Sequence, residues 1–195
     1  HKKAPKKAPK QKPKSVLQDW FDGGDIFFRS KDKTRLAETL NEIVANDLGV
    51  ATIGSNEVIL DHYKNPQHKK LSPTYDAQVH HINPSCGDEI TLNVTLSGQT
   101  VADVSWDGVG CSISQASVSI LSDLVLGKTL AQAQEISDSF MALMQSKGTQ
   151  AGDENLLEDA VALAGVSQYP ARIKCALLGW MAFKDASVQA LAKNK

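Results

Sequence analysis

The feature that most constrains the fold is a pair of alternating segments joined by a short turn. Apolar side chains recur at every second position before and after the turn at Ser97–Thr100, a pattern typical of strands that bury one face. The short turn predicts that the two strands pair antiparallel as a hairpin. The side chains expected to face the core are Ile90, Leu92, Val94, Leu96, Ala102, Val104 and Trp106.

Helical periodicity follows the hairpin and can supply the cover that its apolar face needs. An amphipathic helix is expected over 112–126, and Thr129 with Gln132 resembles a capping box that opens a second helix. The residues expected on the buried faces of these two helices are Ile113, Ala116, Ile120, Leu121, Leu124, Val125, Ile136, Phe140, Leu143 and Met144.

Two further helices are expected toward the C-terminus. Asp153 can cap one that continues to Ala164 and ends at Gly165. Pro170 suits the first turn of a final helix that runs to about Leu191. We expect this last helix to bury Trp180, Met181 and Phe183. Strands followed by helices predict an α+β fold, with a small antiparallel sheet on which helices pack.

The N-terminal part of the chain differs in composition from the rest. Residues 1–14 hold seven lysines, three prolines and no acidic residue, so residues 15–195 carry a net charge of −8 although the whole chain has only −1. We expect 1–14 to be an extended basic tail. We interpret 15–57 as a small appendage of unknown role, with a strand at Ile26–Phe28 and a helix from Leu36 to Leu48, and 58–195 as the main domain.

Composition excludes several classes of protein. No run of about 18 apolar residues is present that would cross a membrane, and no charged-then-apolar leader indicates secretion. Three cysteines are too few, and odd in number, for a disulfide framework. We therefore expect a reducing compartment, the cytoplasm, and no membrane partner.

The cysteines are the strongest candidates for chemistry. Cys86 precedes the first hairpin strand with Asp88 two positions later, Cys111 lies where the second strand gives way to a helix, and Cys175 lies in the first turns of the last helix. Three thiolates and one carboxylate complete a tetrahedral site for Zn²⁺ or an iron–sulfur cluster. Because no CxxC pair is present, three buried and inert cysteines remain the alternative.

Other polar residues near these motifs have simpler interpretations. His80 and His81 are neighbours and would point to opposite faces of a strand, so they cannot bind one ion together. We interpret His62 as a capping or packing residue. Arg172 lies three positions before Cys175, on the same face of the expected helix, where its guanidinium could approach a thiolate or bind a carboxylate.

Four motifs in order resemble the SufU family of the IscU/NifU-like iron–sulfur assembly proteins. They are VILDHYKNPQH at 58–68, HHINPSCGDE at 80–89, GVGCSISQAS at 108–117 and YPARIKCALLGW at 169–180. The interval of 64 positions between Cys111 and Cys175 is longer than in IscU-type chains, and Lys174 stands where those chains have a histidine. The departure from the family is the long segment that precedes position 58.

The resemblance implies an IscU-type fold and a zinc-dependent sulfurtransferase of iron–sulfur cluster biogenesis. It implies zinc bound by Cys86, Asp88, Cys111 and Cys175, with Cys86 as the persulfide acceptor and Arg172 supporting the complex with the donor. The implied donor is a SufS-type cysteine desulfurase, which itself carries the PLP, and the implied acceptors are downstream Suf assembly proteins.

Two alternatives stay open. A scaffold that assembles a [2Fe–2S] cluster would use the same four ligands. A nucleic-acid adaptor would depend on the basic tail alone, and lysine runs are more often simply solvated, so we expect no nucleic-acid partner.

Overall fold

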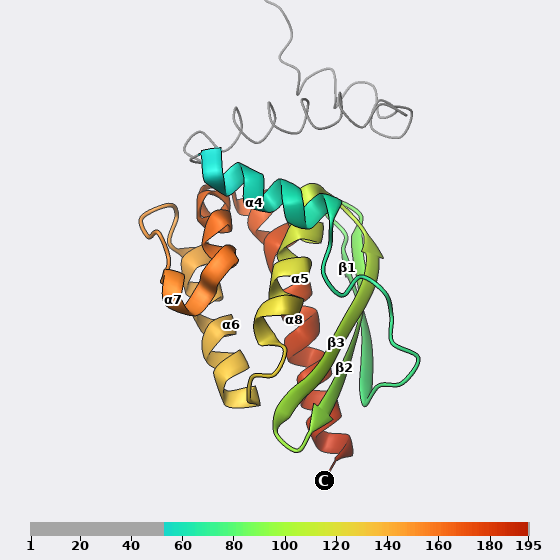
Figure 1. Cartoon of the computed structure of the whole chain (residues 1–195). Helices are drawn as coiled ribbons and strands as arrows, with labels where there is room; N and C mark the ends of the chain where they lie inside the picture. Colours follow the sequence, from blue (N-terminus) through green and yellow to red (C-terminus); the bar gives the residue numbers. More distant parts are fainter. Residues whose placement is uncertain (1–52, 195) are drawn as a thin grey trace, which may run out of the picture. The chain divides into compact units, whose positions relative to one another are not determined.

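The structure is a computed structural model that describes residues 53–194, and its sheet has three antiparallel strands. The strands are β1 (Ala77–Asn83), β2 (Asp88–Ser97) and β3 (Thr100–Val109), with β2 in the centre. The expected hairpin is confirmed as β2 and β3 (Figure 1). Strand β1 was not expected, because only Ala77 and Val79 on its inner face are apolar, while His81 and Asn83 complete that face.

The expectation that every second residue of β3 faces the core is wrong at one position. Ala102 is exposed, whereas Val101 is fully buried. The pairing register shifts between Thr95 and Leu96, so that Thr95 pairs with Asp103 but Leu96 pairs with Val101. This bulge leaves Ala102 as the extra residue, which a strict period of two cannot anticipate.

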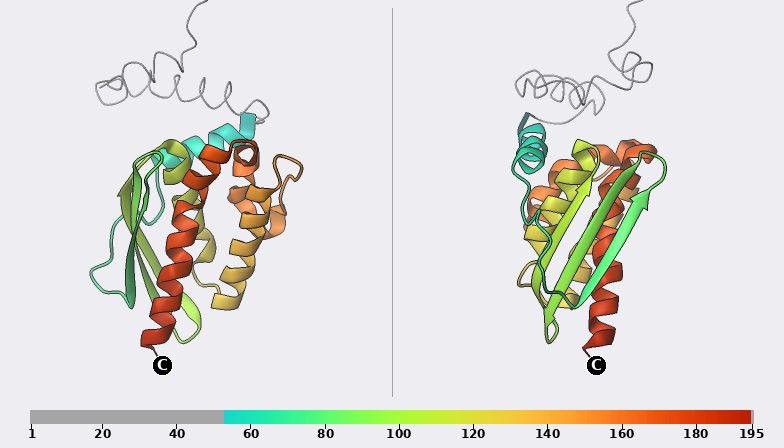
Figure 2. Two further views of the ribbon diagram at one scale, coloured as in Figure 1. Left: turned by 180° about the vertical axis from the view of Figure 1, so that it is seen from behind. Right: turned by 90° about the vertical axis from the view of Figure 1, so that its right-hand side faces the viewer.

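Helices cover one face of the sheet. Helix α8 (Pro170–Lys193) lies along β1 and β2, and α5 (Ser112–Val125) packs against α8 and β3 (Figure 2). Helix α4 (Ile53–Lys64) lies across α5 and the 3₁₀ helix η1 (Glu158–Gln168). Helices α6 (Leu130–Gln145) and α7 (Glu154–Leu157) lie on the side of α5 and α8 that faces away from the sheet. The α+β fold is confirmed.

Helix α5 is confirmed at the expected residues, but it is buried on more than its apolar face, and Asp123 is its exposed residue. All six expected apolar residues are buried, but serines on the other faces are buried as well, among them Ser114, Ser117, Ser119 and Ser122. The serine hydroxyls bond within the protein; Ser117 Oγ donates to the carbonyl of Ala176 at 2.6 Å. Small polar side chains therefore let α4, α8 and η1 surround α5.

The third expected helix is interrupted. Asp153 caps α7 by accepting from the Asn155 amide at 3.0 Å, but the helix ends at Leu157, and Glu158 has φ 45° and ψ −124°. The chain continues as η1, in which Ala160, Leu163 and Val166 are buried. Apolar residues spaced by three match the 3₁₀ repeat rather than the α-helical one, so the helix predicted to Ala164 was wrong.

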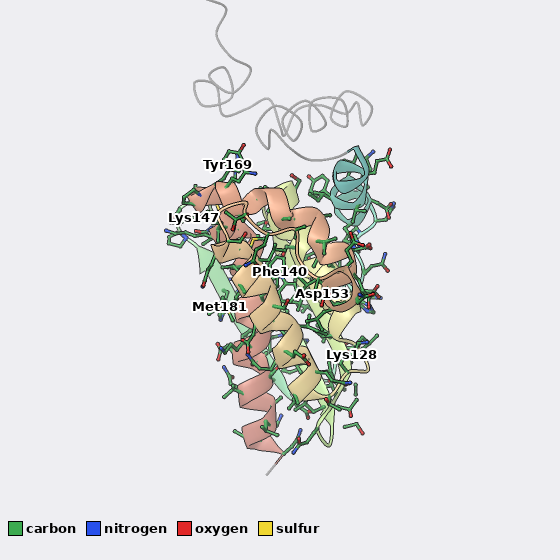
Figure 3. All side chains as sticks on the ribbon, turned by 90° about the vertical axis from the view of Figure 1, so that its left-hand side faces the viewer. Lys128, Phe140, Lys147, Asp153, Tyr169 and Met181 are labelled. Carbon is green, nitrogen blue, oxygen red and sulfur yellow. The ribbon has the colours of Figure 1, made fainter. Side chains whose placement is uncertain are left out.

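The capping box at Thr129 and the start of α8 at Pro170 are confirmed. The four apolar residues expected inside α6 are buried, and Phe140 stacks on Trp180 with ring centroids 4.2 Å apart. Met181 was expected in the core but is 45% exposed (Figure 3). Each step along a helix turns the side-chain direction by about 100°, so Met181 points away from the buried face that holds Trp180 and Phe183.

The basic tail and most of the predicted appendage, including the strand at 26–28 and the helix at 36–48, lie outside the described residues. Helix α4 begins at Ile53 and so runs across the predicted boundary between 57 and 58. Among the described residues, none of the helices is both long and apolar enough to span a membrane.

Candidate metal centre

The three cysteines and Asp88 converge at one end of the sheet, although they come from four separate places in the fold. Cys86 lies in the turn between β1 and β2, and Asp88 is the first residue of β2. Cys111 is the N-cap of α5, and Cys175 lies in the second turn of α8. The fold thus joins residues that are up to 89 positions apart.

The turn that carries Cys86 is closed by hydrogen bonds to β1. The amides of Cys86 and Gly87 donate to the carbonyl of Asn83 at 3.3 and 2.9 Å. Gly87 has φ 72°, a conformation that glycine adopts without steric cost. Cys86 is exposed, so its sulfur is accessible to another protein.

Asp88 and Cys111 are joined by two contacts. The Cys111 amide donates to Asp88 Oδ1 at 2.9 Å, and Cys111 Sγ lies 3.5 Å from Asp88 Oδ2. The Ser114 amide in turn donates to Cys111 Sγ at 3.5 Å, as a helix N-terminus does to its cap. A Cβ at Gly110 would lie 2.8 Å from Asp88 Oδ1, so only glycine allows this approach.

Cys175 is the inner member of the group. It is 1% exposed, and its Sγ lies 3.3 Å from the Sγ of Cys86. The side-chain amide of Asn83 donates to the same sulfur at 3.7 Å. The carbonyl of Ala171, one turn earlier on α8, lies 3.8 Å away and can accept from the thiol.

The donor atoms fit a tetrahedral zinc ion. Ligand atoms of Cys86, Asp88 and Cys175 all lie within 4.8 Å of one another. Tetrahedral zinc with bonds of about 2.3 Å to sulfur places two thiolates about 3.8 Å apart, which is near the 3.3 Å between Cys86 and Cys175. Cys111 adjoins this group through Asp88. Sulfur-rich sites favour zinc or iron–sulfur clusters over calcium and magnesium.

The three thiols differ in acidity. Hydrogen bonding with Cys175 lowers the pKa of Cys111 to about 7, and the Ser114 amide acts in the same direction. Hydrogen bonding with Cys111 and burial both raise the pKa of Cys175. Burial also raises the pKa of the Cys86 thiol. Among the three thiols, Cys111 at the N-terminus of α5 is therefore the most acidic.

Arg172 lies one turn before Cys175 on α8, as expected, and is half-buried. Within residues 53–194 it makes no ion pair. Lys174 is exposed.

The histidines have structural partners. His62 is 8% exposed, with Nδ1 2.8 Å from Ser119 Oγ and Nε2 3.2 Å from Asp159, so the packing interpretation is confirmed. His80 and His81 point to opposite faces of β1: His80 approaches Thr91 and Glu89, and His81 bonds to Asp185 on α8 at 3.1 Å.

Two residues that touch the cysteines, Asn83 and Ser114, were not expected from the sequence. The dipeptide Asn83–Pro84 is a turn signal that could have drawn attention to Asn83. No sequence pattern separates Ser114 from the other serines of α5.

Comparison with known proteins places this geometry in a family. Residues 55–176 match the model of the NifU-like N terminal domain. The chain is 44% identical over 128 residues to the zinc-dependent sulfurtransferase SufU of Bacillus subtilis, across 66% of this chain and 85% of that protein. It is 40% identical over 129 residues to the iron–sulfur cluster assembly scaffold protein IscU of Streptococcus pyogenes, across 66% and 79%.

Solved structures of other proteins share this fold. The crystal structure of FiSufU from Fervidobacterium islandicum AW-1 superposes with a TM-score of 0.62 at 33% identity, covering 67% of this chain and 94% of that one. The N-terminal part of a NifU-like protein from Brucella abortus shares the fold, with a TM-score of 0.65 at 21% identity over 71% and 94%. The chain belongs to the NifU-like N-terminal domain family.

Proposed function

We propose that this protein is a zinc-dependent sulfur relay of iron–sulfur cluster assembly. The observation that carries the proposal is the convergence of Cys86, Asp88 and Cys175 within 4.8 Å, with Cys111 bonded to Asp88. The similarity to proteins named for sulfur transfer and for cluster assembly supports it. The proposed zinc ligands are Cys86, Asp88, Cys111 and Cys175, in a reducing compartment such as the cytoplasm.

In this proposal Cys86 accepts the sulfur. Bound zinc would keep the cysteines deprotonated and protect them from oxidation. Cys86 is the exposed cysteine, and it lies in a turn between two strands rather than within a helix or strand. Its thiolate attacks the outer sulfur of a persulfide on the donor; a new S–S bond forms as the donor's S–S bond breaks, and the donor cysteine leaves as a thiolate.

The donor is a PLP-dependent cysteine desulfurase of the SufS type, and the sulfur then passes to downstream Suf assembly proteins. The test is stimulation of such a desulfurase by the full chain. Cys86→Ser should abolish the stimulation and leave the basal rate of the desulfurase alone unchanged. Undiminished stimulation by this variant would move the acceptor role to Cys111 or Cys175.

Arg172 is proposed to act in the encounter with the donor. Its guanidinium can form two parallel hydrogen bonds with a carboxylate, and loss of one member of a desolvated interface pair costs about 2–5 kcal/mol. Arg172→Ala should keep its zinc and melting temperature but lose most of the stimulation, and Arg172→Lys should recover part of it. Lys174→Ala, at an exposed neighbouring position, is the matched control. Loss of zinc together with activity would make Arg172 a structural support instead.

The second candidate is a scaffold for a [2Fe–2S] cluster on the same ligands, favoured by the relatives named as IscU scaffolds. Protein purified without added iron separates the two functions. A colourless protein with one zinc per chain supports the relay. A brown protein with iron and sulfide supports the scaffold.

A further inference from the structure

Asn83, the last residue of β1, makes polar contacts with a sulfur of the cysteine cluster and with the turn that carries Cys86. It is 5% exposed. Its Nδ2 donates to Cys175 Sγ at 3.7 Å, and its Oδ1 accepts from the Ser85 amide at 3.1 Å. Its backbone carbonyl accepts from the amides of Cys86 and Gly87. One buried side chain therefore touches the sulfur of Cys175 and also shapes the turn that carries Cys86.

The contact with Ser85 is local. An Asn side chain that accepts from an amide two residues later forms an Asx turn, which serine can imitate with its hydroxyl. Together with the carbonyl contacts to Cys86 and Gly87, this turn fixes the position from which Cys86 reaches the cluster. These contacts account for the acceptor groups of Asn83 but not for its amide donor.

The amide donor has an electrostatic role. Three thiolates and one carboxylate around Zn²⁺ leave about two net negative charges on the site. Hydrogen bonds from N–H groups stabilise such charge, and partners of the metal ligands commonly set both their orientation and the affinity for the metal. A thiolate at Cys175 cannot donate to Ala171, and a Cys86 thiolate has no proton to donate to it. The Asn83 amide is then the side-chain donor that contacts Cys175.

We propose that Asn83 is a positioning residue of the metal site, which holds Cys175 as a fixed thiolate ligand through its side-chain amide while its turn presents Cys86. This inference rests on the proposed function, because it assumes that the cysteines bind a metal. It gives the two neighbouring sulfurs different roles: Cys175 is buried and anchored by Asn83, and Cys86 is exposed and free to leave the metal.

Asn83→Ser separates the two contacts of the side chain. The serine hydroxyl can still accept from the Ser85 amide, but it is too short to reach Cys175. Asn93→Ser is the matched control: Asn93 is 1% exposed in β2 and bonds to Ser72 and Gln78 rather than to a cysteine. Asn83→Asp is a second variant that keeps the shape of Asn83 and its acceptor oxygen but replaces the donor.

The experiment uses the full chain loaded with Zn²⁺ and, separately, with Co²⁺ as a spectroscopic probe. Asn83→Ser should bind zinc about 10- to 100-fold more weakly in competition with a chelating dye. Its thiolate-to-cobalt charge-transfer band should move to lower energy, because the sulfur electrons are less stabilised without the hydrogen bond. Asn93→Ser should keep the wild-type affinity and band, even where its melting temperature falls.

Wild-type affinity and an unmoved band in Asn83→Ser would overturn the proposal, as would an equal change in Asn93→Ser. If Asn83→Ser fails to fold, the band of Asn83→Asp decides, and its expected shift is again to lower energy. Failure of the wild-type protein to bind either metal is a different result, since it would refute the proposed function itself.

Discussion

The cysteine end of the sheet and the aromatic centre of the protein are built by different means. In the aromatic centre, which we define as Phe140 and Trp180, each side chain is at most 1% exposed and the two rings stack within the apolar core. At the cysteine end, exposure ranges from the buried Cys175 to the exposed Cys86, and hydrogen bonds hold the parts together. The difference indicates that stability resides mainly in the aromatic centre and metal affinity at the cysteine end, so substitutions should separate them.

Trp180→Ala should have the largest effect on stability. Trp180 stacks on Phe140, and its indole N–H donates to Ser117 Oγ at 2.9 Å. Removal of a buried aromatic side chain typically costs about 3–5 kcal/mol, measured by urea unfolding of the metal-free protein. Zinc affinity of the folded variant should stay near that of the wild type.

Met181→Ala is the control for this prediction, because Met181 follows Trp180 on α8 but is 45% exposed. Its change should lie within about 0.5 kcal/mol. If Trp180→Ala lost zinc affinity in proportion to stability, the proposed separation of the two regions would be wrong.

Asp88→Ala should affect zinc binding more strongly than it affects stability. It leaves the partly buried amide of Cys111 without its acceptor, which costs about 1–3 kcal/mol in the metal-free protein. It also removes a proposed ligand, so zinc should raise the melting temperature much less than in the wild type. Asp107→Ala, at an exposed residue of β3, should keep the full zinc-induced rise. An unchanged rise in Asp88→Ala would exclude Asp88 from the ligand set.

Ser119→Ala tests a polar contact that lies away from both regions. Ser119 Oγ accepts from the Gln67 amide at 2.7 Å and lies 2.8 Å from His62, so it connects α4 and the segment after it to α5. Because the buried His62 and the partly buried Gln67 amide each lose a partner, we expect a loss of about 1–2 kcal/mol with no change in zinc affinity. Ser139→Ala, on α6 and half-exposed, should change stability little. Loss of zinc from Ser119→Ala would show that α4 supports the metal site.

The sequence predicted the regular parts of the fold well, because their local pattern and their burial agree. The hairpin, the capping box at Thr129 and the start of α8 each depend on residues within a few positions of one another. The failures at Ala102 and Glu158 arise where a bulge and a backbone with φ 45° interrupt the period. Neither the bulge nor the positive φ coincides with a residue type that would indicate it in the sequence.

The sequence could predict which residues belong to the candidate site but not how they are arranged in space. The residue types of Cys86, Asp88, Cys111 and Cys175 suggested a metal, and the family resemblance supplied the grouping. The turn signal at Asn83 could be noticed, but its contact with Cys175 could not be predicted, because it joins residues 92 positions apart. Such a contact exists only after β1, which the sequence did not reveal, has packed on α8.

The smallest expected effect is at Asp76, far from the cysteines. Asp76 Oδ2 accepts from the Leu96 amide at 2.7 Å and from Asn194 at 3.1 Å, and the first of these contacts, followed by the second, lowers the pKa of Asp76. A carboxyl with a lowered folded-state pKa stabilises the protein above the unfolded-state value of about 3.9, and this contribution is lost as the pH falls through the folded-state pKa. Asp76→Asn should therefore be slightly less stable than the wild type at pH 6, by less than about 1 kcal/mol because the site is partly exposed. In urea titrations of metal-free protein, the difference should shrink as the pH is lowered below about 4. A difference that stayed constant down to acid pH would mean that Asp76 acts through the shape of its hydrogen bonds and not through its charge.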